Sequence, residues 1–172
     1  MTARGGPSPA RAEPFDPVLH DVSAFSCGRV VLDEWLRESA AGAQSRRVAR
    51  TFVRTEPGSK TVVGYYSLAG HLLLRDGLPR SVGHGSPRQV PAVVLARLAL
   101  DVSVQGAGDG AALLVDALGR VVAASRIVAA RFVVVDALDD EAHGFYEHFG
   151  FTSLDGHRLV RKVSAVEADL SV

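Results

Sequence analysis

Short apolar runs rich in β-branched residues alternate along the chain with segments of helical periodicity. Such runs predict buried strands, because a strand covered on both faces carries apolar residues at nearly every position. On this pattern we expect strands at 49–55, 61–69, 93–102, 131–135, 151–154 and 157–163. The residues at 56–59 (Glu-Pro-Gly-Ser) favour a turn, so the first two strands should form a hairpin.

Three segments show the periodicity of amphipathic helices, at 30–44, 109–124 and 139–149. On the apolar side of the first we expect Val31 and Trp35, with Leu32 and Leu36. The expected apolar positions of the second are Leu113, Leu114, Ala117, Leu118 and Val121. Acidic residues at 139–141 suit the positive end of the third helix, and Gly150 should end it as a left-handed cap.

This order of elements, without an internal repeat, predicts an α/β fold with a mixed central β-sheet flanked by helices. The 172 residues, 47% of them hydrophobic, support a single domain, which we place at 15–165. Residues 1–14, with their prolines and glycines, are expected to form a disordered tail, and 166–172 a second tail. The glycine-rich segment 70–90 predicts a mobile loop with at most a short strand or turn.

Composition excludes several classes of protein. The formal net charge is zero, so no global field attracts nucleic acid. The one cysteine, Cys27, excludes an internal disulfide and suits a reducing cytoplasm. No run approaches the ~18 apolar residues that a membrane span requires, and no cluster predicts a metal site. We therefore expect a cytoplasmic protein without a membrane anchor.

The strand that ends near Asp101 leads into a glycine-rich turn that opens a helix. Glycines allow the backbone to approach a ligand closely, and the amides of Gly106 to Ala111 would point outward at a positive helix end. This arrangement predicts a phosphate or pyrophosphate site. A P-loop would need Lys and Ser/Thr after Gly110, and a dinucleotide fingerprint would need G-x-G-x-x-G. The spacing that remains is Q-x-x-G-x-G, formed by Gln105, Gly108 and Gly110.

That spacing resembles the pyrophosphate loop of the GNAT N-acetyltransferases, which bind acetyl-coenzyme A. A second motif carries the same resemblance. The string from Phe145 to Phe151 (Phe-Tyr-x-x-x-Gly-Phe) is similar to the last helix of GNAT enzymes, whose tyrosine lies beside the cofactor sulfur. The alternative is a glycine-rich turn that only connects a strand to a helix.

The N-terminal half narrows the resemblance. Leu-Asp-x-Trp-Leu at 32–36, Gly-Tyr-Tyr-Ser-Leu at 64–68 and Arg-Leu-Ala-x-Asp at 97–101 are together similar to the GNAT toxins of bacterial type II toxin–antitoxin modules. The similarity covers residues 14 to 163. It implies a GNAT fold whose sheet splays at the acetyl-CoA strand, and transfer of acetyl from acetyl-CoA to the α-amino group of aminoacyl-tRNA, which blocks translation. It also implies a ribbon-helix-helix antitoxin as a partner and a homodimer.

The same resemblance assigns roles to particular residues. The cofactor-binding residues would be Leu98, Ala99, Leu100, Gln105, Gly106, Ala107, Gly108, Asp109, Gly110 and Ala111. Tyr146 would be the catalytic residue, protonating the departing thiolate, since a phenol with a pKa of about 10 carries its proton at neutral pH. No metal takes part. No strong general base is evident, and His71, His84, His143 and His148 are interpreted as surface or packing residues.

A tRNA substrate requires local positive charge. Residues 44–54 hold four arginines and no acid, and the segment 70–90 adds three more. Our candidate tRNA-binding residues are Arg46, Arg47, Arg50, Arg75, Arg80 and Arg88, with Arg54 beside the first three. Ordinary solvated arginines are the alternative.

Two features depart from the GNAT pattern. The first position of the loop is Gln105, where many GNAT loops have an arginine, and the inner positions, Ala107 and Asp109, provide no basic residue. Asp109 must point away from a bound pyrophosphate. Two other functions therefore stay open: a GNAT enzyme that acetylates a small amine or a protein terminus, and a degenerate GNAT domain without catalysis.

Overall fold

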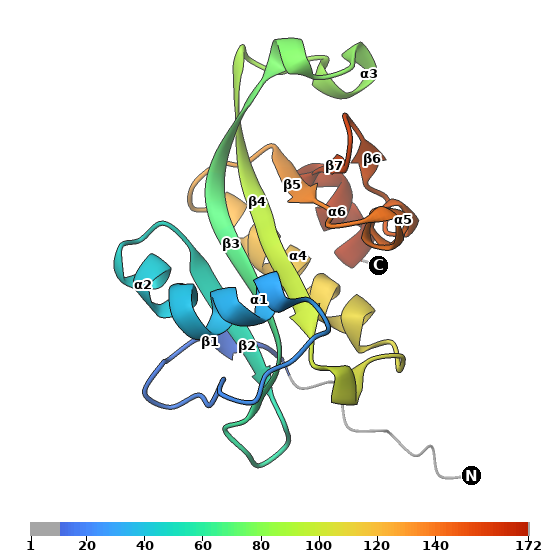
Figure 1. Ribbon diagram of the computed structural model, residues 1–172. Helices are drawn as coiled ribbons and strands as arrows, with labels where there is room; N and C mark the ends of the chain where they lie inside the picture. The colour runs from blue at the N-terminus through green and yellow to red at the C-terminus, as the bar shows by residue number, and fades with distance from the viewer. Residues whose placement is uncertain (1–10, 172) are drawn as a thin grey trace, which may run out of the picture. The chain divides into compact units, whose positions relative to one another are not determined.

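The computed structural model describes residues 11–171, in which strands and helices alternate as an α/β fold (Figure 1). The strands are β1 (Glu13–Pro14), β2 (Arg50–Thr55), β3 (Val62–Leu74), β4 (Gln89–Leu100), β5 (Phe132–Asp136), β6 (Thr152–Ser153) and β7 (Arg158–Lys162). The helices are α1 (Val30–Glu34), α2 (Ala40–Ser45), α3 (Arg80–Gly83), α4 (Asp109–Ser125), α5 (Asp140–His148) and α6 (Val163–Leu170). A π-helical turn, η1 (Trp35–Ser39), joins α1 to α2, and 3₁₀ turns form η2 (Arg75–Gly77) and η3 (Val102–Val104).

Hydrogen bonds join the strands into one sheet in the order β1-β2-β3-β4-β5-β7-β6. β4 and β5 are parallel, whereas β1 pairs antiparallel with β2, and β7 antiparallel with β5 and β6. The mixed sheet confirms the predicted fold class. The register of β4 with β5 ends at Leu95 opposite Val135, while β4 continues to Leu100. The stretch expected to hold acetyl-CoA thus follows the point where this pairing ends.

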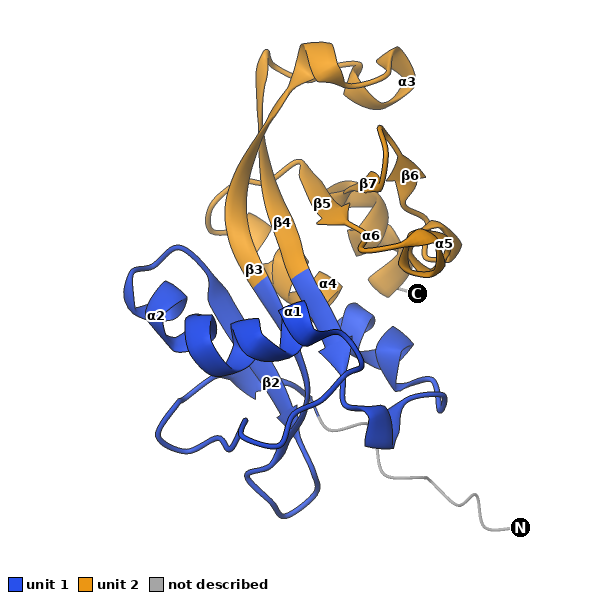
Figure 2. Ribbon diagram, viewed as in Figure 1, with its two compact units in different colours: residues 1–67, 97–116 blue, residues 68–96, 117–172 orange. Residues whose placement is uncertain are grey.

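The chain divides into two compact units (Figure 2). Unit 1 comprises the residues up to Ser67 together with Arg97–Asp116, and unit 2 comprises Leu68–Ala96 together with the residues from Ala117 onward. β3, β4 and α4 each begin in one unit and end in the other. The expectation of a single domain over 15–165 stays a prediction.

The core of unit 1 lies between the helical segment 30–45 and strands β2, β3 and β4. Leu32, Leu36 and Ala40 form the buried stripe of that segment and pack with Val53 and Tyr65. The spacing of four residues places the first three on one helical face. The expected apolar side was wrong in part, because Val31 is 70% exposed. Trp35, also expected on the apolar side, is half-buried and packs against this core.

The core of unit 2 is built on β5, whose residues Phe132–Val135 are all buried, as the apolar run predicts. Leu73, Val90 and Val160 from the neighbouring strands pack with Phe132 and Val134. Helix α4 confirms the predicted apolar side, since its five expected positions are all buried. Gly150 ends the segment after α5 with a φ of +86°, which confirms the left-handed cap.

The segment 70–90 holds more regular structure than the predicted loop with at most a short strand or turn. β3 continues to Leu74, a 3₁₀ turn and α3 follow, and β4 begins at Gln89. Leu72 and Leu74 are exposed on either side of buried Leu73, so an apolar residue at each position hides the alternation of a strand. Hydrogen bonding between β3 and β4 stabilises this strand, which the local sequence does not indicate.

Both expected tails, 1–14 and 166–172, include residues that belong to regular structure. Residues 1–10 lie outside the described residues, but Ala12 and Phe15 are buried and Glu13–Pro14 form β1, opposite Val53 and Phe52 of β2. At the other end, helix α6 occupies positions 163–170 and buries Val163 and Val166. Residues at 166–170 are therefore helical rather than a tail, while Val172 lies outside the described residues.

Candidate active site

The glycine turn of unit 1 has the backbone that the sequence predicts. Helix α4 begins at Asp109, directly after the exposed stretch 105–108. Gly106 and Gly108 have φ angles of +84° and +82°, which side chains of L-residues rarely adopt. A Cβ built at either glycine would meet no atom within 4 Å, so the space beside the turn is open. The turn therefore presents backbone to an open face at a helix N-terminus, as an anion site requires.

The side chain of Gln105 fixes the turn from within. Its Nε2 donates hydrogen bonds to the carbonyl oxygens of Cys27, at 2.9 Å, and Leu100, at 2.8 Å. The sequence motif identified Gln105 as a cofactor-binding residue, but these contacts give its side chain an anchoring role. The turn is thus connected to the end of β4 and to the loop before α1.

Asp101 fixes the backbone between the end of β4 and the glycine turn. Its carboxylate accepts hydrogen bonds from the backbone N–H of Ser26, at 2.9 Å, and from both the N–H and hydroxyl of Ser103. Burial opposes ionisation of this carboxyl, but the hydrogen bonds outweigh it and hold the pKa of Asp101 below its ordinary value. The sequence does not indicate this role of Asp101 as a backbone anchor, because its partner Ser26 is distant in the chain.

Asp109 forms an ion pair that sequence reasoning did not predict. Its Oδ1 accepts a hydrogen bond of 2.8 Å from Nη1 of Arg54, near the end of β2. The side chain of Arg54 is only 15% exposed, and its buried Nε has no hydrogen-bond partner. Arg54 is therefore not a solvated arginine, and it differs in this from the other arginines expected to contact tRNA.

The stretch Leu98–Leu100 forms the end of β4. Ala99 is buried in the core of unit 1, while Leu98 and Leu100 are half-buried. A Cβ at Gly64 of β3 would lie 3.0 Å from the Leu100 side chain and 3.6 Å from the carbonyl oxygen of Ala99. Glycine at 64 therefore permits the close approach of β3 to the end of β4.

Arg97 is a charged residue in this apolar strand, and its place in the motif at 97–101 is the only signal of it in the sequence. Its guanidinium carbon lies 3.8 Å from the centroid of the Trp35 ring, as a cation–π contact. The Trp35 ring in turn stacks on Tyr65, at a centroid distance of 6.1 Å. Burial lowers the pKa of Arg97. The cationic head is thus partly withdrawn from water in the segment next to Leu98.

Tyr146 lies in α5 of unit 2 and is 7% exposed. Its ring makes edge contacts with Phe145, at 5.3 Å between centroids, and Phe151, at 5.5 Å. Asp139 caps the helix by accepting a hydrogen bond from the N–H of Ala142, at 2.8 Å. Burial raises the pKa of Tyr146 to about 12, so the phenol keeps its proton at neutral pH.

The six candidate tRNA-binding arginines are all exposed, but they belong to different units. In unit 1, Arg46 caps the C-terminus of α2, Arg47 has a φ of +60°, and Arg50 begins β2. The remaining three lie in unit 2. There the N–H of Arg75 donates to the carbonyl of Arg88, and Arg80 begins α3. Each group is compatible with contacts to phosphate.

The histidines considered as bases form local contacts. His143 pairs with Glu147 at 2.9 Å and contacts the hydroxyl of Ser153 at 3.1 Å. His71 lies 3.3 Å from Arg158, which also binds Asp136. These contacts agree with packing roles. Among residues 11–171, no group of histidine, cysteine and acidic side chains is arranged to hold a metal ion.

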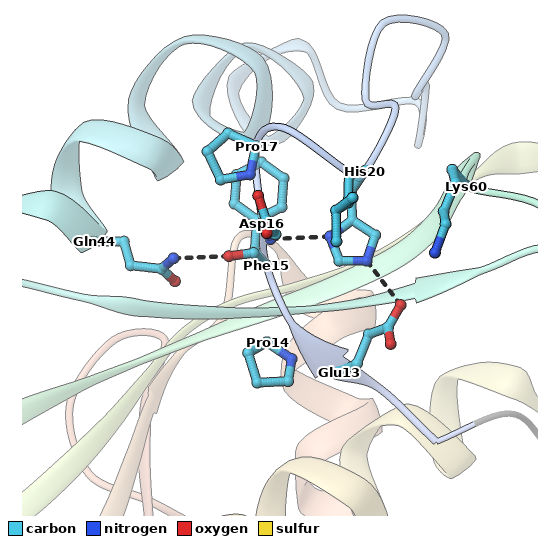
Figure 3. A pocket seen from close by; sticks show the side chains of 9 residues that line it. Glu13, Pro14, Phe15, Asp16, Pro17, His20, Gln44 and Lys60 are labelled. Atoms are coloured by element: carbon cyan, nitrogen blue, oxygen red, sulfur yellow. Dashed lines mark hydrogen bonds and ion pairs between the residues drawn. The ribbon is translucent and has the colours of Figure 1, made fainter.

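Sequence reasoning also missed His20, which lines a pocket of about 450 Å³ in unit 1 (Figure 3). Its Nδ1 accepts from the N–H of Asp16 at 2.9 Å, and its Nε2 contacts Glu13 at 2.7 Å. This pattern fits the neutral Nε2–H tautomer donating to the carboxylate. Because both ring nitrogens are occupied, His20 serves to hold β1 and the following loop.

Comparison with known proteins bears on this site. No protein-family model matches the sequence. The chain is similar to the tRNA-acetylating toxin of Mycobacterium tuberculosis, with 41% identity over 131 residues that cover 76% of this chain and 78% of the relative. In the described part of the chain, no helix has the length and hydropathy of a membrane span.

Solved structures extend the similarity. AtaT complexed with acetyl-methionyl-tRNAfMet is 31% identical, with a TM-score of 0.84, and the match covers 92% of this chain and 98% of that one. A tyrosine-to-phenylalanine mutant of AtaT, bound to the C-terminus of the antitoxin AtaR and acetyl-CoA, is 28% identical with a TM-score of 0.81. That match covers 94% of this chain and 97% of the AtaT chain. The chain therefore belongs to the family of tRNA-acetylating toxins, which are GNAT-type acetyltransferases.

Proposed function

We propose that this chain transfers the acetyl group of acetyl-CoA to the α-amino group of aminoacyl-tRNA and so blocks translation. The observation that carries the proposal is the open glycine turn before α4, in a chain that is 41% identical to a tRNA-acetylating toxin. The relative AtaT, in complexes with acetyl-CoA and with acetyl-methionyl-tRNAfMet, supports both the donor and the acceptor.

The turn at 105–111 would hold the pyrophosphate of acetyl-CoA. Its backbone amides and the N-terminal end of the 17-residue helix α4 supply the positive potential, since no basic side chain lies within the turn itself. The end of β4, from Leu98 to Leu100, would bind the pantetheine arm through backbone groups that β5 does not pair. The thioester supplies an activated acetyl group to an attacking amine.

Tyr146 would act as the general acid. Attack of the amine on the thioester carbon gives a tetrahedral oxyanion, whose collapse expels a thiolate that must be protonated. A buried phenol whose pKa is raised to about 12 is fully protonated at neutral pH and has a proton to donate. Its edge contact with Phe151 restricts where the ring can lie.

The acceptor needs little help from a base. Model α-amino groups have a pKa near 8, against about 10.4 for a lysine side chain, so part of an aminoacyl α-amine is already neutral at pH 7. The contacts of His71 and His143 with Arg158 and Glu147 agree with this view. Proton loss to water is sufficient.

The exposed arginines would contact the tRNA backbone. Arg46, Arg47 and Arg50 follow one another within a short stretch of unit 1, and Arg75, Arg80 and Arg88 within a stretch of unit 2. Because phosphate neutralisation supplies most nucleic-acid affinity, local clusters can act even when the net charge is zero.

The same proposal includes a cytoplasmic location, an antitoxin of the ribbon-helix-helix type and a homodimer. The antitoxin is supported by the AtaT complex with the C-terminus of AtaR. Sedimentation of the toxin alone and with its antitoxin tests both assemblies. A monomer at all concentrations would remove the homodimer from the proposal.

Cell-free translation tests the function as a whole. Adding the protein should stop protein synthesis only when acetyl-CoA is present, and Tyr146→Phe should relieve the arrest. Arrest without acetyl-CoA would contradict the acetyl-transfer mechanism. Absence of arrest, combined with acetylation of a small amine, would favour an ordinary GNAT acetyltransferase.

A further inference from the structure

The carboxylate of Asp109 lies where the proposed cofactor site should be least tolerant of negative charge. Asp109 is the first residue of α4 and follows Gly108, whose backbone faces open space. The side chain is 22% exposed. A free carboxylate at this position would repel the diphosphate of acetyl-CoA, which approaches the same helix end.

Arg54 removes this conflict. It belongs to β2, 55 residues earlier in the chain, yet its Nη1 donates to Oδ1 of Asp109 at 2.8 Å. Its guanidinium is largely buried, and the Nε forgoes a hydrogen bond in that position. A buried polar atom without a partner is unfavourable, and the ion pair with Asp109 is an interaction that offsets this cost.

We infer that Arg54 is a positioning residue for the cofactor: it neutralises Asp109 and holds the carboxylate aside, so that the glycine turn can accept a pyrophosphate. This inference rests on the proposed function, since it requires acetyl-CoA at the turn. It gives Arg54 a different role from the exposed arginines of the same segment, because its Nη1 is already committed within the protein.

The inference predicts that mutating Arg54 and mutating Asp109 change acetyl-CoA affinity differently. Arg54→Gln leaves the carboxylate of Asp109 uncompensated, so acetyl-CoA affinity should fall about tenfold, which corresponds to about 1.4 kcal/mol. Asp109→Asn removes the repulsive charge and should bind acetyl-CoA at least as tightly as the wild type. The double mutant, Arg54→Gln with Asp109→Asn, should recover most of the affinity that Arg54→Gln loses.

Binding is measured by titration calorimetry, and two further readouts separate this role from a purely structural one. The Arg54→Gln defect should shrink between about 0.05 M and 0.5 M salt, because salt screens repulsion between charges. The KM for acetyl-pantetheine, a thioester donor without phosphate, should be the same in Arg54→Gln as in the wild type. Arg54→Lys, which keeps the charge, should retain most of the affinity for acetyl-CoA.

The matched control is Arg126→Gln, which removes an arginine–carboxylate pair with Glu167 on the surface of unit 2. It should leave acetyl-CoA affinity unchanged. Equal acetyl-CoA affinity in the wild type and Arg54→Gln would overturn the inference. A double mutant that binds acetyl-CoA as weakly as Arg54→Gln would also overturn it, because Arg54 would then act independently of Asp109. If the folded wild type binds no acetyl-CoA, the proposed function itself fails.

Discussion

Replacing Gly108 by alanine isolates the backbone requirement of the glycine turn. The new Cβ would meet no atom within 4 Å, so steric overlap with the protein cannot explain any effect. The φ of +82° remains, and an L-residue in the left-handed region is disfavoured by about 1–2 kcal/mol. Only the fraction of molecules that keeps the turn can bind, so the apparent affinity for acetyl-CoA should fall about five- to thirtyfold.

Gly119→Ala is the matched control. Gly119 lies within α4, outside the glycine turn, and does not have a positive φ, and its added Cβ would meet no atom within 4 Å. Acetyl-CoA affinity should therefore stay close to that of the wild type. Calorimetric titration of both variants, with thermal melting to confirm folding, compares them directly.

Gly108→Glu adds a charge to the same backbone strain. At about 4 Å in water, each pair of unit charges contributes about 1 kcal/mol of repulsion, so a diphosphate adds about 2 kcal/mol to the cost of the turn. The total corresponds to a loss of more than about a hundredfold in affinity. Unchanged binding by Gly108→Ala and Gly108→Glu would refute the placement of the pyrophosphate, and equal losses in Gly108→Ala and Gly119→Ala would refute the role of the positive φ.

Three other predictions address the remaining parts of the site. Tyr146→Phe should lower kcat by about a hundredfold to ten-thousandfold while the KM for acetyl-CoA stays the same, and wild-type turnover with chemistry rate-limiting would place the acid elsewhere. Arg46→Ala with Arg47→Ala should weaken activity on charged tRNA and flatten its salt dependence by about one unit of slope for each phosphate that is no longer neutralised. The same double mutant should acetylate a small amine normally, and equal activity on tRNA at all salt concentrations would exclude this face. Burial raises the pKa of Cys27 to about 11 and that of Tyr146 to about 12 in the folded state. Since the unfolded groups ionise at about 8.5 to 10, the free energy of unfolding should decrease between about pH 9 and pH 11, and denaturant midpoints that do not change would contradict this.

The parts of the fold that sequence predicts are those fixed by local chemistry. The run at 132–135 is apolar at every position and becomes a fully buried strand. Gly150 has a positive φ, which its place after α5 indicates in advance, and the glycines at 106 and 108 predict the turn that precedes α4. In each case the signal lies within a few residues of the feature that it predicts.

What could not be predicted depends on partners distant in sequence. Val31 and Leu32 are equally apolar, and only packing against Val53 and Tyr65 decides that the stripe through Leu32 is buried. Residues 70–74 are extended because β3 pairs with β4. The role of Arg54 could not be predicted for the same reason. The sequence around it indicates a basic cluster, and only the structure shows the 2.8 Å contact with Asp109.

The most direct test of the central claim is acetyl transfer from labelled acetyl-CoA to total charged tRNA, with deacylated tRNA as the control. We predict that label enters only charged tRNA, is released with the amino acid on mild alkaline hydrolysis of the ester, and is lost with Tyr146→Phe. Identification of the released N-acetylamino acid then defines the acceptor. Label that appears equally in deacylated tRNA, or in neither RNA while a small amine is acetylated, would contradict the assignment of aminoacyl-tRNA as the substrate.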